Sequence, residues 1–210
     1  MSPASSPARS SAPAPAGAPA MAPGFTNPVF DSQRMFRHLL EAMSYPGRIV
    51  AVGALASAPA PLSPAAAAAC LSLVDYETPV WLDAATQPAR DWLRFHCGCP
   101  VIADPAKARF AVAADAASLL PLSAFDPGTD EYPDRSTTLI VEVAGLGSDG
   151  GLHLTGPGIR DETRLTVDGL PARVWDQWRE NRVLFPGGVD LILTCGDRLA
   201  ALPRTVKVEV

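Results

Sequence analysis

Residues 136–146, STTLIVEVAGL, are the stretch of the sequence that decides the fold. Threonine, isoleucine and valine favour extended backbone because their branched side chains pack well on a pleated surface. The run is apolar enough to lie at the centre of a sheet rather than at its edge. It therefore predicts a buried strand that is covered by other structure on both faces.

Shorter runs of the same kind occur before and after this strand. We expect them to complete the sheet, with residues 151–156 pairing with 136–146 across a glycine turn and the last run, which alternates, lying at an edge. These runs are RIVAV (48–52), TPVWL (78–82), FAVA (110–113), GLHLTG (151–156), VDLILTC (189–195) and TVKVEV (205–210).

Helical patterns interleave with these strands. The first is predicted over 33–45, capped by Asp31 or Ser32 and ended by Pro46-Gly47, with apolar positions Phe36, Leu39, Leu40 and Met43. Others are predicted from Ser63 to about Asp75, from Thr86–Pro88 onward with Trp92, Leu93 and Phe95 as its buried face, and over 171–181. This order predicts the α/β class, with a mixed central sheet flanked by helices.

The first 24 residues differ in composition from the rest. Residues 1–24 are almost entirely Pro, Ala, Ser and Gly, so we expect a disordered tail that has no apolar run of the kind found in a signal peptide. Residues 25–210 are long enough to bury one core and are expected to form a single α/β domain.

Charge and hydropathy exclude some classes of partner. The net charge is −5, which argues against nucleic acid as the main partner. No segment approaches the roughly 20 apolar residues needed to cross a bilayer, so no membrane partner is expected. Four cysteines without a signal sequence fit a reducing cytoplasm.

Several catalytic motifs can be tested against the sequence. GLGSDG (145–150) matches G-x-G-x-x-G, but the strand-like GLHLTG follows it instead of a helix, which favours a hairpin turn over a dinucleotide site. The sequence contains no P-loop, no G-x-S-x-G and no H-E-x-x-H. Its three histidines, at 38, 96 and 153, lie in different predicted elements.

Two corners carry residues suited to binding an anion. In LTGPGIRDE (154–162), Gly156 and Gly158 permit the backbone conformations in which successive amides point at an anion, and Arg160 adds a charge. Arg204 precedes the last predicted strand in LPRTVKV. The alternative for both arginines is a solvated surface position.

The same segments resemble the PhnH family, a subunit of the bacterial carbon–phosphorus lyase system. The resemblance covers about 180 residues in a consistent order. It is carried by SQRMFRHLLEAMSYPG, LVDYETPVWL, LRFH, TTLIVEV, LTGPGI and FPGGVDLILTCGDRLAALPRTVKVEV.

The resemblance implies a cytoplasmic, non-autonomous subunit that works with PhnG, PhnI and PhnJ. Their system forms α-D-ribose 1-methylphosphonate 5-triphosphate from ATP and methylphosphonate, and a later subunit breaks the carbon–phosphorus bond. It also implies a homodimer whose fold is similar to the large domain of pyridoxal-phosphate-dependent transferases. It supplies no catalytic residue and no cofactor. The alternatives are a self-sufficient transferase on such a scaffold, or a pure scaffold that contacts neither phosphonate nor ATP.

The resemblance also bears on HCGC (96–99). Its matching piece is LRFH, which adds Arg94 and His96, at a helix end, to the candidate anion-binding residues and leaves out Cys97 and Cys99. Two thiols one residue apart are poorly spaced for a structural zinc, so no metal site is expected.

Two further expectations concern lysine and tryptophan. A Schiff base needs a lysine, and Lys107, in a polar turn, and Lys207, in the terminal strand, follow no cofactor motif, so pyridoxal chemistry is not expected. Trp175 and Trp178 lie three residues apart on one helix, where they face either the core or a partner.

Overall fold

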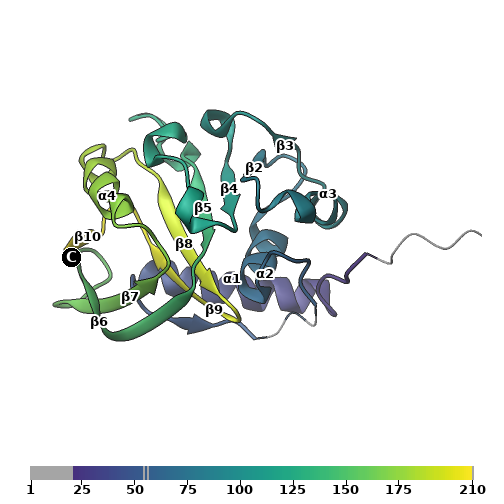
Figure 1. Cartoon of the computed structure of the whole chain (residues 1–210), viewed down its shortest axis with the longest axis horizontal. Coiled ribbons are helices and arrows are strands. Elements are labelled where there is room, and N and C mark those ends of the chain that lie inside the picture. Colours follow the sequence, from purple (N-terminus) through teal and green to yellow (C-terminus); the bar gives the residue numbers. More distant parts are fainter. Residues whose placement is uncertain (1–20, 54, 56, 210) are drawn as a thin grey trace, which may run out of the picture.

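A seven-stranded mixed sheet forms the middle layer of the protein (Figure 1). The computed structural model describes residues 21–53, 55 and 57–209. Most of the tail predicted over 1–24 therefore lies outside the described residues. Residue 22 already packs against the core, so packed structure begins before residue 25.

The strand order of the large sheet is β1-β9-β8-β5-β4-β2-β3. The strands from β8 to β3 run parallel to one another, whereas β9 and β1 are antiparallel to their neighbours. The bounds are β1 Val50–Ala51, β2 Val80–Leu82, β3 Val101–Ile102, β4 Phe110–Ala113, β5 Thr138–Glu142, β8 Asp190–Cys195 and β9 Arg198–Leu202.

β5 lies between β4 and β8, as its apolar sequence predicts. Leu139, Ile140 and Val141 are fully buried, and their side chains alternate between the two faces of the sheet. The predicted strand 136–146 is nevertheless two elements, because the chain leaves the large sheet after Glu142 and enters a second one at Gly145.

The second sheet has three antiparallel strands in the order β10-β6-β7, with bounds β6 Gly145–Thr155, β7 Thr163–Asp168 and β10 Lys207–Glu209. The predicted pairing of residues 151–156 with 136–146 is wrong, since they belong to β6 and pair with β7 and β10. The hairpin turn expected at GLGSDG is also wrong. This segment is the first half of β6. The pairing of β6 with β7 shifts register between Gly147 and Leu152, and β6 bends but continues as one strand.

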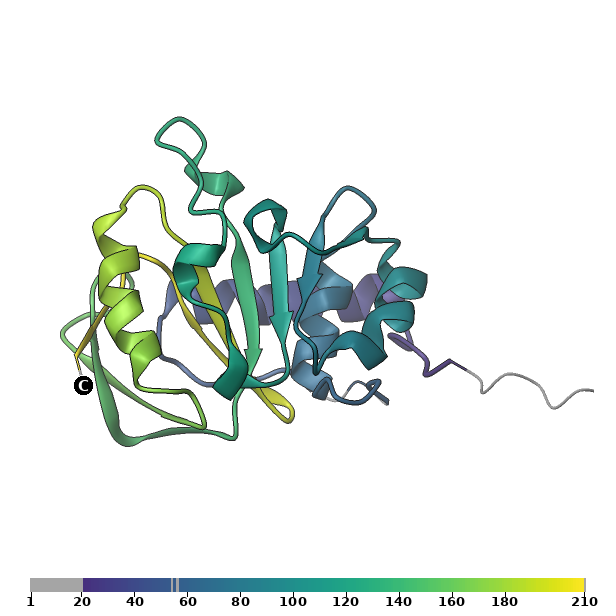
Figure 2. The same cartoon turned by 45° about the horizontal axis from the view of Figure 1, so that its top comes forward.

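Helices cover one face of the large sheet (Figures 1 and 2). The core on this face contains residues of α1 (Pro28–Ser44), α2 (Pro64–Leu73) and α3 (Arg90–Cys97). α2 is an alanine run whose small side chains let the helix lie close to the sheet, with Ala65, Ala66, Ala67 and Ala69 fully buried.

The opposite face is covered by α4 (Arg173–Val183), the small sheet and short 3₁₀ turns. Trp175 is 6% exposed and Trp178 is fully buried, so the core alternative for this pair is confirmed. The Trp178 Nε1 donates to the Val206 carbonyl at 2.9 Å, which joins α4 to the residue directly before β10.

Several helix predictions need correction. α1 begins at Pro28, five residues earlier than expected, because the Asn27 side chain caps it by accepting a bond from the Phe30 amide. Phe36 and Leu40 are 51% and 56% exposed, and Phe95 is 70% exposed, although an apolar pattern predicted them inside. Leu39 is buried as predicted and Met43 packs against the core, but the rest of the buried stripe of α1 is Met35 and Ala42.

The remaining predictions fare better. Ser63 caps α2 as expected, and β4 and β8 are confirmed. β10 lies at an edge as predicted, but of the small sheet and not of the large one. Within the described residues, none of the helices is both long and apolar enough to span a bilayer.

Candidate functional site

The six predicted anion-binding residues lie on three segments, two of which are neighbours, because Gly156 packs against the backbone of Thr205, the residue after Arg204. Gly156, Gly158 and Arg160 follow β6, Arg204 follows β9, and Arg94 and His96 belong to α3. In Figure 1, α3 lies at the opposite end of the molecule from β6. They therefore do not form one pocket, and each place has to be assessed separately.

The corner after β6 uses its glycines for close packing. Gly156 and Gly158 both have positive φ, at 136° and 83°. A Cβ at Gly158 would collide with the Ser44 carbonyl oxygen and lie 2.9 Å from Pro46 Cδ, so the corner fits tightly over the turn that follows α1. Arg160 is exposed at the rim of this corner. Arg160 is therefore the one of these three residues whose side chain offers a charge to solvent.

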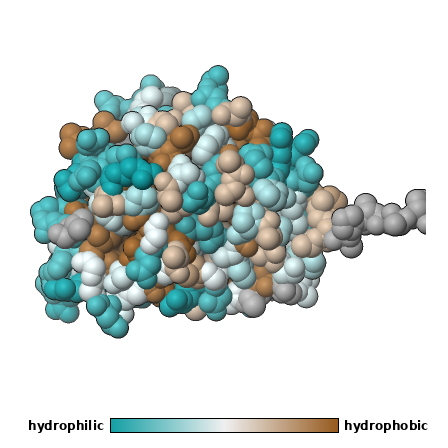
Figure 3. All heavy atoms as spheres, viewed as in Figure 1, coloured by the Kyte–Doolittle hydropathy of each residue, from teal (hydrophilic) through white to brown (hydrophobic). Residues whose placement is uncertain are grey.

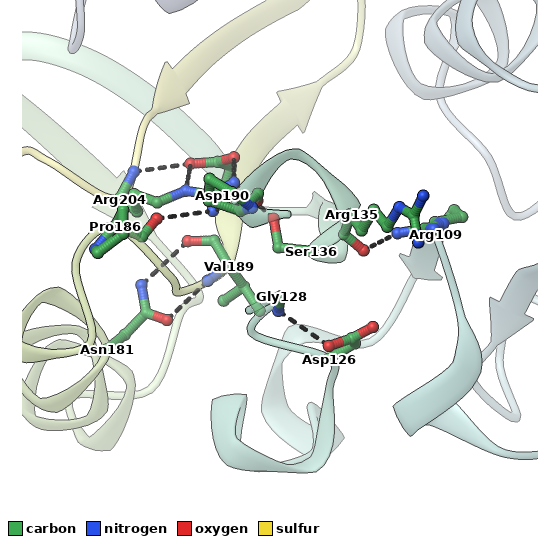
Figure 4. Close-up of polar contacts among 11 residues, drawn as sticks. Arg109, Asp126, Gly128, Arg135, Ser136, Asn181, Pro186, Val189, Asp190 and Arg204 are labelled. Atoms are coloured by element: carbon green, nitrogen blue, oxygen red, sulfur yellow. Dashed lines mark hydrogen bonds and ion pairs between the residues drawn. The ribbon is translucent and has the colours of Figure 1, made fainter. Parts of the chain in front are cut away.

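Arg204 is enclosed at the edge of the sheet where the parallel strands begin (Figure 4). Its guanidinium pairs with Asp190, with Nε 3.1 Å from Oδ1 and Nη2 2.5 Å from Oδ2. The remaining donors reach the carbonyls of Pro133 at 2.8 Å and Pro186 at 3.3 Å, and the hydroxyl of Ser136. The two charged side chains are only 14% and 12% exposed. The guanidinium is thus fully used within the chain, and Arg204 is neither a solvated arginine nor free for an outside anion.

This network fixes two loops that leave the sheet at the same edge. Arg204 ties residues 133–136 to residues 186–190, and the Asn181 side chain on α4 holds both the amide and the carbonyl of Val189, at 2.7 and 3.0 Å. Sequence reasoning missed Asp190 and Asn181, since neither belongs to a recognisable motif.

Three exposed apolar residues lie at the end of α4 and at the start of one of these loops. Val183, Leu184 and Phe185 are 83%, 53% and 64% exposed, and we call them the α4 ledge. Figure 3 shows hydrophobic residues in separate patches on this face, one of them at the upper left over the end of α4. Such a group on a fixed loop is suited to contact with another protein.

The edge at which open α/β sheets usually bind ligands is filled by the chain itself. The order β3-β2-β4-β5 makes the carboxyl ends of β2 and β4 the switch point, because the chain turns in opposite directions after these two strands. Asp83 lies there, 4% exposed, and accepts bonds from the amides of Thr86 at 2.7 Å and Asp115 at 3.0 Å. Thr86 is fully buried and accepts from the Ala114 amide. These side chains occupy the crevice.

A groove of about 590 Å³ lies beside α3, and we call it the α3 groove. It is lined by Tyr76, Arg90, Asp91, Arg94, Phe95, Gly98, Cys99, Pro100 and Val101. Arg90 and Arg94 lie one turn apart and therefore project from the same face of the helix. Two cations and two exposed aromatic rings in one hollow can bind an anion that carries a planar group.

His96 belongs to the support of this groove rather than to its lining. Its Nε2 lies 3.1 Å from the Ala22 carbonyl oxygen, which also accepts from Trp92 Nε1 at 2.7 Å. The ring lies 4.7 Å from that of Trp92 and 5.0 Å, edge-on, from that of Phe95. Arg94 and His96 are separated by two positions on α3, and side chains at that spacing point to different sides of a helix. They therefore do not converge on one ligand.

The cysteines beside this groove are structural. Cys97 is the last residue of α3, and Gly98 closes the helix in the left-handed conformation, so HCGC is a helix end. Burial raises the pKa of the Cys97 thiol to about 12 and that of Cys70 well above its usual value. Among the residues that the structure describes, no cluster of three or more His, Cys, Asp or Glu side chains is arranged to hold a metal ion.

Comparisons with known proteins agree over nearly the whole length. Residues 23–209 match the family model described as bacterial phosphonate metabolism protein (PhnH). The sequence is 42% identical over 187 residues to the α-D-ribose 1-methylphosphonate 5-triphosphate synthase subunit PhnH of Rhizobium meliloti (strain 1021), covering 88% of this chain and 94% of the relative. It is 35% identical over 182 residues to a protein of Stutzerimonas stutzeri named as a candidate C-P lyase subunit protein, HtxG, covering 85% and 86%.

Proposed function

The chain belongs to the PhnH family of bacterial phosphonate metabolism proteins, and from this we propose that it is a subunit of the carbon–phosphorus lyase system. In this role it supports formation of α-D-ribose 1-methylphosphonate 5-triphosphate from ATP and methylphosphonate. The observation that carries the proposal is the 42% identity that spans 94% of a curated subunit of that synthase. A match of this length includes every element of the fold rather than one shared motif.

The arrangement of the reactive side chains supports a subunit without activity of its own. His38, His96 and His153 lie on α1, α3 and β6. Lys107 and Lys207 are exposed, and each pairs with a carboxylate, Asp104 at 3.4 Å and Glu209 at 2.5 Å. These positions weigh against Schiff-base chemistry and against the self-sufficient transferase. The kinship of the fold to pyridoxal-phosphate-dependent transferases remains part of the proposal.

The proposal includes partners and location. We expect a cytoplasmic homodimer of single-domain chains that joins PhnG, PhnI and PhnJ. The α4 ledge and the exposed apolar side chains of α1 supply surface for such contacts. For an anion contact, Arg160 and Arg94 are the predicted residues that stay exposed, since Arg204 is enclosed.

Reconstitution tests the proposal. Adenine release from ATP and methylphosphonate should be absent with this protein alone or with PhnG, PhnI and PhnJ alone, and present when all are combined. Light scattering of the isolated protein should give about twice the 22.0 kDa chain mass. Adenine release by this protein alone would favour the self-sufficient transferase. Full activity of PhnG, PhnI and PhnJ without this protein would show that the reaction does not require it.

A further inference from the structure

The two arginines of the α3 groove are exposed and have no partner of their own. Neither Arg90 nor Arg94 forms an ion pair or a side-chain hydrogen bond with any residue that the structure describes. Arg34 and Arg179 each pair with an aspartate at 2.6 Å, whereas Arg160 and Arg164 resemble Arg90 and Arg94 in having no such pair among the described residues. What sets Arg90 and Arg94 apart is that both line one groove. The α3 groove therefore presents two uncommitted guanidinium groups side by side.

Charge in this groove is locally positive on a chain of net negative charge. Two arginines face one lining carboxylate, Asp91. Arg94 also acts on the groove wall, since burial raises the pKa of the Cys99 thiol and the nearby guanidinium opposes that rise. An anion with more than one charge is the ligand that such a pair of cations selects.

Two aromatic rings stand over the same hollow. Tyr76 and Phe95 are 73% and 70% exposed, and both line the groove. Phe95 packs edge-on against His96, whose position is fixed by the Ala22 carbonyl, so this ring has support from behind. Exposed rings beside cations are a common platform for the planar base of a nucleotide.

We propose that the α3 groove binds a nucleoside triphosphate, with its phosphates on Arg90 and Arg94 and its base against Phe95 or Tyr76. A simple phosphonate or phosphate would use the arginines and leave both rings without a role. The volume, about 590 Å³, is within the range of small-molecule sites. This inference rests on the proposed function, because it names the substrate class that this subunit would hold for its complex.

Titration calorimetry on the isolated protein tests it, with ATP, inorganic tripolyphosphate and adenosine as probes. ATP should bind, and Arg94→Ala or Arg90→Ala should weaken it about tenfold each through the loss of a charge-assisted contact. Phe95→Ala should weaken ATP binding and leave tripolyphosphate binding unchanged. Arg164→Ala is the matched control, since this exposed arginine lies on β7 at the far end of the molecule and should have no effect.

The outcomes separate this inference from the proposed function. Undetectable ATP binding at millimolar concentration, or ATP binding that survives the Arg90→Ala, Arg94→Ala double variant, would overturn the inference, while reconstituted activity would still support a subunit role. Equal effects of Phe95→Ala on ATP and tripolyphosphate would overturn the assignment of the rings to a base. If the double variant loses PhnG, PhnI or PhnJ and keeps ATP binding, the groove is a protein interface instead.

Discussion

Arg204 and Asp190 face each other where the parallel strands begin, with Nη2 2.5 Å from Oδ2 and with the backbone amide of Arg204 donating to Oδ1 at 2.7 Å. One arginine thereby joins the start of β8 to the end of β9 and to two loops. Among the described residues, all the bonds of its guanidinium are to groups of the chain itself.

Removing this arginine should destabilise the fold. Arg204→Ala leaves the Asp190 carboxylate nearly buried without its partner and leaves the Pro133 and Pro186 carbonyls unbonded, at an expected cost of about 3 kcal/mol in the free energy of unfolding. Urea denaturation measures this loss in the free energy of unfolding, with Arg164→Ala as the surface control. A cost equal to that of the control would show that the network contributes nothing to stability. The double variant Arg204→Met, Asp190→Leu should lose less than the two single variants together, since no charge is then left unpaired.

Gly158 should resist substitution more than another glycine of similar backbone. Gly158 and Gly196 both have positive φ, at 83° and 61°, so alanine at either position is destabilising because its backbone must adopt the left-handed conformation. Only at Gly158 does the new Cβ meet other atoms, those of Ser44 and Pro46. Gly158→Ala should therefore cost about 1–3 kcal/mol more than Gly196→Ala by chemical denaturation. Equal costs would mean that the turn after α1 can move aside.

Glu142 should make stability depend on pH. Burial raises the pKa of its carboxyl above the usual 4.5, against the opposing bond from the Ser63 amide at 2.5 Å. The folded chain then holds this proton to higher pH than the unfolded chain, so its stabilising contribution is complete below the usual pKa and is lost as pH rises through the folded one. Glu142→Gln does not titrate. Its stability relative to the parent should increase as pH rises above 4.5, the usual pKa of the carboxyl, measured by urea denaturation at each pH. A constant difference would contradict this.

The four thiols should differ in reactivity. Burial raises the pKa values of the Cys70, Cys97 and Cys99 thiols, to about 12 for Cys97 although that residue, like Cys195, is only half-buried, and a thiol in its protonated form reacts slowly. Cys195 is half-buried at the end of β8. Iodoacetamide at neutral pH should therefore label Cys195 first, as read by mass spectrometry, and the others only after denaturant is added. Rapid labelling of Cys97 in the folded protein would contradict the assignment.

The sequence predicts the centre of the fold better than its edges. Strands such as β4 and β8 are buried on both faces, so their apolar runs identify them. β3 has two half-buried residues and β7 is mostly polar, and neither carries a pattern that separates it from a loop. The glycines of GLGSDG suggest a turn, yet β6 uses them inside a bent strand that pairs with β7. Whether these segments form strands depends on their pairing with other segments of the chain, and a local sequence pattern does not reveal that pairing.

The site was predictable only where its residues are close in sequence. Arg90 and Arg94 could have been paired from their spacing on one helix, and Tyr76 is near them only because α2 ends beside α3. The partner of Arg204 lies 14 residues earlier, across the turn between β8 and β9, so its enclosed position becomes visible only in the folded chain. Phe95 follows the apolar pattern of a core residue and is exposed, because the helix ends at Gly98 with that side turned to the groove.

The position of β1 has a consequence for synthesis on the ribosome. Val50 of β1 pairs with Leu199 of β9, and α1 packs on β9. The first elements of the domain therefore cannot complete their packing until β9, one of the last elements, has been made. While residues 51–197 are being made, the buried side of α1, including Met35 and Leu39, has no β9 to cover it. The nascent chain must therefore carry an open apolar surface until nearly the whole protein has emerged, which is the condition under which chaperones bind and truncated chains aggregate.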